Sequence, residues 1–143
     1  MGHVAESIKS HVGNELLWFS MPSDTRAWAV VAPEAIRRTI AFLRESGGRL
    51  ATMTGVEVRD GIEVNYHICF DHDGLVITVR ALASWPEPSL ESVAQDFPGA
   101  LWIEREIHDV LGVSFVGHPD MRRLVLPDDW PEGNYPLRKG FQA

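Results

Sequence analysis

The sequence predicts an α+β domain built on antiparallel strands and followed by an extended C-terminal segment. From Ile62 to Phe70, apolar and polar residues alternate with the period of a half-buried strand. Asp73-Gly74 is a strong hairpin signal, and a looser alternation follows it at Leu75–Val79. Prolines at positions 119, 127, 131 and 136 exclude a long helix from roughly the last 25 residues.

The N-terminal part of the chain predicts helices and short strands. In order, these are a helix at 4–12, strands at 15–20 and 27–32, and a helix from 33 to Gly47-Gly48. Pro33 suits the first helical position, and Glu34 favours the positive end of the helix dipole. Ile36, Ile40 and Leu43 then repeat at helical spacing. The predicted helix therefore has one apolar face to bury.

The centre of the chain predicts a three-stranded antiparallel meander. Asp60-Gly61 is a second turn signal, so residues 49–59 form the strand that precedes 62–70. After the meander, Ser89 can cap a short helix that ends at Pro98-Gly99. A further helix is predicted at 100–111, where Gly112 is placed to end it in a left-handed conformation.

Composition excludes several classes of protein. The net charge of −7 disfavours a nucleic-acid partner, because such affinity depends on lysine and arginine. A single cysteine, Cys69, allows no internal disulfide and no iron-sulfur cluster, which favours a cytoplasmic chain without a cluster. No apolar run approaches the ~20 residues that a membrane crossing needs, so direct membrane insertion is not expected.

Charged residues dominate one side of the helix predicted at 100–111. Those outside its apolar arc are Glu104, Arg105, Glu106, His108 and Asp109. A solvated helix face is the simplest interpretation, with Arg105 and Asp109 paired across one turn. Trp102 lies on the same side, however, and an aromatic ring among charges is typical of protein interfaces.

Metal binding and hydrolytic catalysis are weaker alternatives. His108, Asp109, His118 and Asp120 are possible metal ligands, but their spacing matches no zinc motif. Asp128-Asp129 could do acid–base chemistry, although adjacent residues of an extended segment point apart. We therefore expect no catalytic, cofactor-binding or metal-ligating residue, while an independent metal-binding enzyme using His118, Asp120 and Glu106 stays the competing hypothesis.

The C-terminal segment is better suited to recognition. Its charged groups can make paired hydrogen bonds to a partner's backbone and carboxylates. They are Asp120, Arg122, Arg123, Asp128, Asp129, Arg138 and Lys139. Because the segment has little regular structure with which to satisfy its own amides, we expect it to lie along a neighbouring protein. The sequence thus divides into an α+β domain at 1–116 and a partner-binding segment of the same domain at 117–143.

One ordered pattern resembles a known family. It comprises Glu104-Arg105-Glu106, Asp109, Gly112, Phe115, Gly117-His118-Pro119-Asp120, Arg122-Arg123, Leu126-Pro127-Asp128-Asp129-Trp130 and Pro136-Leu137-Arg138-Lys139. These residues resemble the 30 kDa subunit of NADH-quinone oxidoreductase (complex I) and its relatives in membrane-bound hydrogenases and formate hydrogenlyase. Val110-Leu111 departs from the usual complex I pattern, and Tyr135 before Pro136 is more similar to the hydrogenase branch.

The resemblance implies a two-layer domain, with helices packed on a mostly antiparallel mixed sheet, that binds no redox centre. It implies a non-catalytic subunit of the cytoplasmic arm of a respiratory complex, peripheral on the cytoplasmic face of the inner membrane. The expected partners are the large hydrogenase-like subunit that walls the quinone cavity and an iron-sulfur subunit. A nickel-iron hydrogenase or formate hydrogenlyase is the alternative complex. The expected partner-binding residues are Trp102, Glu104, Arg105, Glu106, Asp109, His118, Asp120, Arg122, Arg123, Asp128, Asp129, Arg138 and Lys139.

Overall fold

The computed structural model describes residues 3–141, so the outermost residues of both predicted segments lie outside it. Its helices are α1 (His3–Val12), α2 (Ile36–Glu45) and α3 (Ala100–Leu111), with short 3-10 turns at Gly13–Glu15 and Pro33–Ala35. Its strands are β1 (Leu16–Ser23), β2 (Arg26–Val31), β3 (Arg49–Val58), β4 (Gly61–Phe70), β5 (Leu75–Ser84), β6 (Ser89–Glu91) and β7 (Ser114–Val116). No helix within this range is both long and apolar enough to cross a bilayer.

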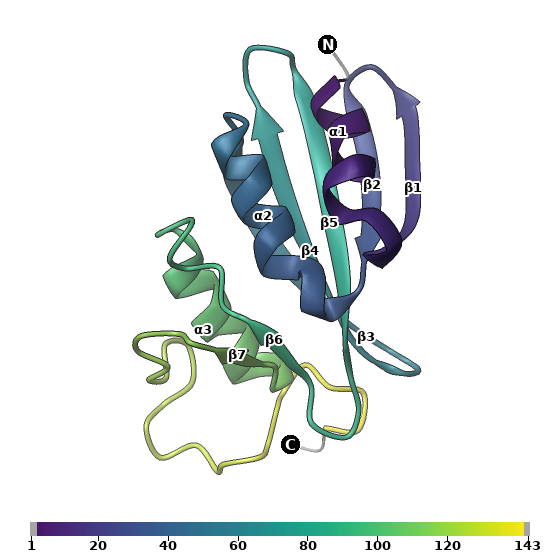
Figure 1. Cartoon of the computed structure of the whole chain (residues 1–143). Coiled ribbons are helices and arrows are strands. Elements are labelled where there is room, and N and C mark those ends of the chain that lie inside the picture. The colour runs from purple at the N-terminus through teal and green to yellow at the C-terminus, as the bar shows by residue number, and fades with distance from the viewer. Residues whose placement is uncertain (1–2, 142–143) are drawn as a thin grey trace.

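The main sheet has five strands in the order β1-β2-β5-β4-β3. All neighbouring pairs are antiparallel except β2 and β5, which are parallel because α2 and the β3–β4 hairpin lie between them in the chain. Helices α1 and α2 cover one face of this sheet (Figure 1). The expected two-layer α+β fold with a mostly antiparallel mixed sheet is therefore confirmed.

Strand β4 shows how sequence pattern becomes packing. All five apolar residues that alternate along it, from Ile62 to Phe70, are buried. It pairs with β5 over ten residues without a register shift, from Gly61 opposite Ser84 to Phe70 opposite Leu75. Because the side-chain period is two, any one-residue slip would turn this apolar row away from the core. The pattern at 62–70 thus fixes the register of the sheet centre.

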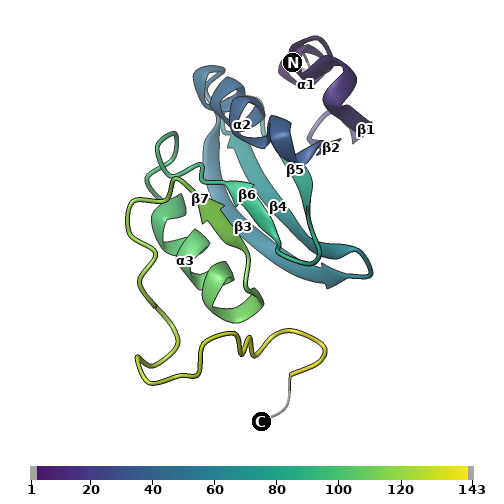
Figure 2. The ribbon, with the colours of Figure 1, turned by 60° about the horizontal axis from the view of Figure 1, so that its bottom comes forward.

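Helix α3 packs beside the main sheet together with the small β6–β7 sheet (Figure 2). Gly55 of β3 allows this approach, since a Cβ atom there would lie 2.7 Å from Leu111 of α3. The helix predicted after Ser89 is wrong. Residues 89–91 instead form β6, where Leu90 pairs with Phe115 of β7.

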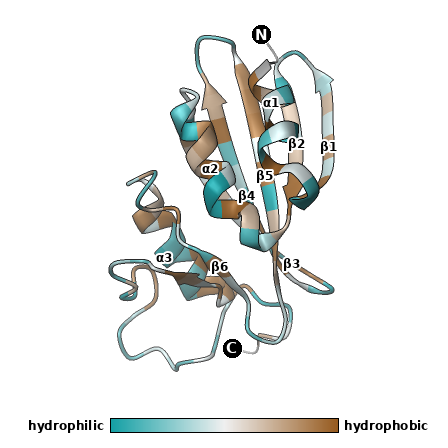
Figure 3. Cartoon of the chain, in the orientation of Figure 1, coloured by the Kyte–Doolittle hydropathy of each residue, from teal (hydrophilic) through white to brown (hydrophobic). Residues whose placement is uncertain are grey.

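Residues 117–141, hereafter the tail, contain no helix or strand and run around the outside of α3 (Figure 2), with hydrogen bonds to the helix at Asp109 and Leu111. Hydrophobic residues gather where α2 meets the sheet, whereas the tail is mostly hydrophilic or neutral in hydropathy (Figure 3). No residue from 116 to 141 is buried as a whole. The tail therefore adds no core of its own, and its conformation depends on contacts with α3 and β3.

Candidate functional site

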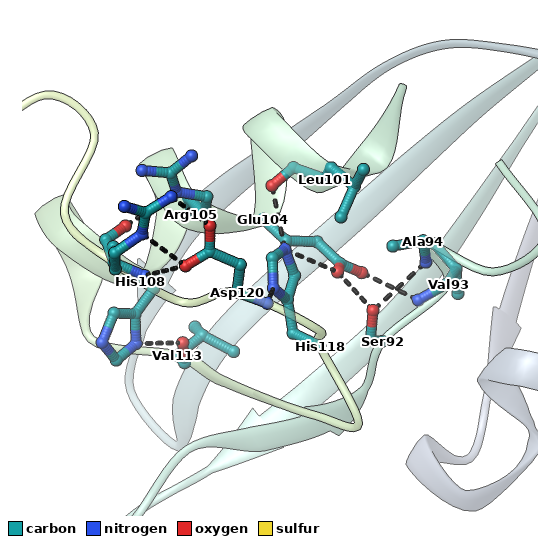
Figure 4. Close-up of polar contacts among 11 residues, drawn as sticks. Ser92, Val93, Ala94, Leu101, Glu104, Arg105, His108, Val113, His118 and Asp120 are labelled. Atoms are coloured by element: carbon teal, nitrogen blue, oxygen red, sulfur yellow. Dashed lines mark hydrogen bonds and ion pairs between the residues drawn. The ribbon is translucent and has the colours of Figure 1, made fainter. Parts of the chain in front are cut away.

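Glu104, on the first half of α3, is completely buried. One carboxylate oxygen accepts a 2.6 Å hydrogen bond from the Ser92 hydroxyl, and the other accepts a 2.8 Å bond from the Val93 amide (Figure 4). Interpreting this side of α3 as a solvated face is therefore wrong for Glu104. Its carboxylate binds the segment just after β6 through the Ser92 hydroxyl and the Val93 amide.

His118 connects this buried carboxylate to the start of the tail. Its Nδ1 accepts a 3.0 Å hydrogen bond from the Asp120 amide, so Nε2 carries the ring hydrogen and donates it to the Leu101 carbonyl at 2.9 Å (Figure 4). Nε2 also lies 3.9 Å from Glu104. Burial raises the pKa of Glu104 above its ordinary value, while the hydrogen bonds from Ser92 and Val93 oppose that shift.

Asp109 holds the middle of the tail. It is almost fully buried, and its Oδ2 accepts amide hydrogen bonds from Leu124, Val125 and Leu126 at 2.9, 2.9 and 3.3 Å. The predicted pairing of Asp109 with Arg105 is not formed. Instead, the Arg105 guanidinium donates to the carbonyls of residues 122 and 123 at 2.7 and 2.8 Å. Two charged residues of α3 thus bind adjacent parts of the tail backbone: Arg105 binds carbonyls, and Asp109 binds amides.

Two arginines of the tail donate hydrogen bonds to backbone carbonyls of the chain. Arg123 donates to the carbonyls of residues 127 and 128 at 2.8 and 3.0 Å. Arg138 donates to the Leu111 carbonyl at 2.7 Å and lies over the Tyr135 and Trp85 rings. The expectation that the tail cannot satisfy its own backbone is therefore wrong for much of its length.

Other members of the predicted set face solvent. Arg122 and Asp120 form a two-pronged ion pair at 2.8 and 2.7 Å, and the Arg122 side chain is 81% exposed. The Arg122 guanidinium lowers the pKa of Asp120 to about 2. Trp102 is 61% exposed with Arg105 near its ring. Exposed positions also include Glu106, Asp128, Asp129 and Lys139.

Two exposed apolar tail residues were not among the predicted partner-binding residues. Val125 is 51% exposed and Leu137 is 64% exposed. An apolar residue in an irregular segment carries no periodic signal, so only its measured exposure distinguishes it. Ser92 was missed for a similar reason, since nothing local in the sequence connects it with Glu104, twelve residues away.

The proposed metal ligands are used in other ways. His108 is hydrogen-bonded through Nδ1 to the Val113 carbonyl at 2.8 Å, and Asp109 and His118 bind the backbone as described. Across residues 3–141, no group of three or more His, Cys, Asp or Glu side chains is arranged to hold a metal ion. His118, Asp120 and Glu106 therefore do not form such a group.

The region that holds this network is also the region that identifies the family. The family model for the 30 kDa subunit of respiratory-chain NADH dehydrogenase matches residues 29–143, which include α3 and the entire tail. The chain belongs to this family. It is also 36% identical over 118 residues to the membrane-bound hydrogenase subunit beta of Pyrococcus furiosus, with 79% of this chain and 68% of that protein covered.

Some relatives are longer than this chain. The chain is 34% identical over 139 residues to an NADH-quinone oxidoreductase subunit of Chloroherpeton thalassium, with 91% of this chain but 52% of that protein covered. The chain thus spans about half the length of this relative. A chain in the solved structure of the membrane-bound sulfane sulfur reductase, an archaeal respiratory membrane complex, has the same fold. The TM-score is 0.86 at 24% identity, over 98% of this chain and 84% of that chain.

Proposed function

We propose that this 30 kDa-type subunit is a non-catalytic structural component of a complex I-type oxidoreductase. In this proposal it docks on the large hydrogenase-like subunit that walls the quinone cavity, contacts an iron-sulfur subunit, and supports electron transfer to quinone. The family match through the tail carries the proposal. The complex would place the chain on the cytoplasmic face of the membrane, held there by its partners.

The exposed side chains of α3 and the tail support docking there. From residue 116 to 141 no residue is buried as a whole, yet the backbone is held by Arg105, Asp109 and Arg138. A fixed surface on which α3 presents Trp102 and the tail presents Leu137 can bind without first ordering itself, which reduces the entropy cost of association. Burial of such exposed apolar side chains by a partner stabilises the complex.

Coexpression with its genomic neighbours, with a tag on the large subunit, tests the proposal. Wild-type chain should copurify with the tagged subunit. Trp102→Asp should weaken the association by about 2 kcal/mol, or roughly thirtyfold, because a buried tryptophan is a typical interface anchor.

Trp18→Asp is the matched control, because Trp18 is 55% exposed on the edge strand β1, away from α3. It should leave the association unchanged. Failure of the wild-type chain to copurify, or equal effects of the two substitutions, would contradict docking through α3 and the tail.

A membrane-bound hydrogenase or formate hydrogenlyase is the second candidate complex. The Pyrococcus furiosus hydrogenase relative favours it, since this chain covers more of that protein than of the Chloroherpeton thalassium relative, 68% against 52%. The same copurification distinguishes the two, because a nickel-bearing large subunit in the purified complex identifies a hydrogenase. Elemental analysis of the complex provides that measurement.

A further inference from the structure

A cavity of about 470 Å³ lies between α3 and tail residues 121–135. This volume is within the range of small-ligand pockets and is large enough for a long side chain. Its lining includes His108 and Asp109 from α3, and Trp130, Glu132 and Tyr135 from the tail. The cavity exists because the tail touches α3 near residues 122–126 and again near 137–138, and curves away from the helix in between.

The α3 side of the cavity offers unused hydrogen-bond acceptors. Asp109 is only 3% exposed, and all three amides that it binds contact Oδ2, so Oδ1 is left without a partner among residues 3–141. His108 donates its Nδ1 hydrogen to Val113, which leaves Nε2 of the neutral ring as an acceptor. Asp109 Oδ1 is not among the fully buried atoms of the described residues that lack a partner, so it opens to the cavity, where a donor from outside the chain can reach it.

The tail side adds negative charge and aromatic surface. Residues 124–137 contain three carboxylates, those of Asp128, Asp129 and Glu132, and no lysine or arginine. No hydrogen bond or ion pair within the described range involves these carboxylates. Trp130 and Tyr135 line the cavity. Because Arg138 already lies over the Tyr135 ring, Trp130 is the aromatic residue available to attract a new cation.

Two arginines also line the cavity, but each already has a partner. Arg122 is paired with the Asp120 carboxylate through two hydrogen bonds. Arg123 donates to two tail carbonyls. Arg123 binds only carbonyls and keeps its charge, whereas Asp120 neutralises Arg122. The carboxylates of Asp109, Asp128, Asp129 and Glu132 therefore outnumber the one uncompensated arginine in and beside the cavity, which favours a positively charged occupant.

We infer that this cavity receives an arginine or lysine side chain from the partner subunit. The inference rests on the proposed docking function and specifies the chemistry of the contact. The cationic group binds Asp109 Oδ1 and His108 Nε2 on the helix side and passes Glu132 at the entrance. The sequence predicted that both the carboxylates and the arginines of this region bind a partner, and this inference assigns the contact in the cavity to carboxylates. Arg122 is paired with Asp120, and Arg123 and Arg138 donate to backbone carbonyls of the chain.

Charge reversal within the coexpressed complex tests the inference. Glu132→Lys places a positive charge at the cavity and should weaken retention on the tagged large subunit by about tenfold or more. Glu132→Gln, which removes the charge but keeps the shape, should weaken it less. Glu132 is exposed in the free chain, so unchanged thermal unfolding of the isolated subunit would verify that each variant folds.

Glu45→Lys is the matched control, since Glu45 is an exposed carboxylate at the end of α2, away from the cavity. It should leave retention unchanged. Retention of Glu132→Lys at the wild-type level, while Trp102→Asp still releases the chain, would overturn the cation-binding cavity and leave the docking function standing. A loss caused by Arg122→Glu but not by Glu132→Lys would show an anionic occupant and also overturn it. If the wild-type chain did not copurify with the tagged large subunit, the proposed function itself would be overturned.

Discussion

At the scale of single residues, two buried carboxylates connect α3 to other segments of the chain. Glu104 and Asp109 are carboxylates on one helix. Glu104 accepts from a hydroxyl and a backbone amide after β6, and Asp109 accepts from three backbone amides of the tail. Burying a charge is costly unless hydrogen bonds compensate it. Both carboxylates meet that condition, which makes them internal connectors between α3, β6 and the tail.

Removing the Asp109 carboxylate should free the middle of the tail. Asp109→Ala leaves the amides of residues 124–126 without an acceptor, so their local opening should become easier by about 2 kcal/mol, or roughly thirtyfold in exchange rate. Amide hydrogen exchange of the isolated chain measures this. Asp128→Ala, which removes an exposed carboxylate that binds no group in the described range, should change those rates little; equal exchange in the two variants would refute the role of Asp109.

Glu104 should make stability depend on pH in a particular direction. Its pKa in the folded chain is raised, mainly by burial, above the ordinary value of 4.5. The folded state then binds the proton more tightly than the unfolded state, so the stabilisation is complete below pH 4.5 and is lost as pH rises through the folded pKa. The stability difference between wild type and Glu104→Gln, from urea unfolding at several pH values, should therefore shrink as pH rises. A difference that grows with pH would contradict this.

At the scale of elements, the end of α3 is the point where helix and tail meet. Gly112 ends the helix with a φ of 81°, a left-handed conformation that costs other residues about 1–2 kcal/mol. A Cβ atom there would also lie 2.6 Å from the Tyr135 ring and would contact Arg138. Glycine at this position therefore allows both the left-handed end of α3 and the close packing of Tyr135 and Arg138 against it.

Gly112→Ala should consequently cost more than backbone strain alone. Gly133→Ala is the control, because Gly133 has a φ of 78° but no atom lies within 4 Å of the position that its Cβ would take. Thermal unfolding should show a larger loss for Gly112→Ala, and exchange at the amide of Leu137, which bonds to Val110, should increase only in that variant. Equal losses would show that the Tyr135 and Arg138 contacts add nothing.

At the scale of the whole molecule, the tail is a preorganised surface. Its contacts run from His118 at one end to the Lys139 amide, which binds the Glu57 carboxylate of β3 at 2.8 Å, at the other. Between them Asp109 and Arg105 of α3 fix the middle. The tail therefore has a defined conformation in the single chain, whereas the sequence alone suggested that only a partner could order it.

Amide exchange across the isolated chain should reproduce this pattern of contacts. The amides of residues 124–126, 137 and 139 should be protected, because each has an acceptor on α3 or β3. The amides of Asp129 and Glu132, in the part of the tail that curves away from α3, should exchange faster. Uniformly fast exchange over residues 117–141 would show that the tail orders only on binding.

The sequence by itself determined the sheet, the main helices, the irregular tail and the family. Strand alternation, turn residues and glycine stops act over a few residues, so they can be read locally, as at 62–70 and Gly112. It misassigned residues 89–97, where Leu90 and Phe97 have helical spacing, because pairing with β7 and the distant Glu104 carboxylate outweighed that local preference.

Only the tertiary structure decided how the charges are used. Glu104, Asp109 and Arg138 are indistinguishable by sequence from solvated surface charges, because burial and hydrogen-bond partners depend on segments up to tens of residues away. The same fold leaves Trp102 and Leu137 exposed. Local pattern fixes which elements form, whereas the direction of each charged side chain is set by which unsatisfied backbone groups the packed chain brings near it.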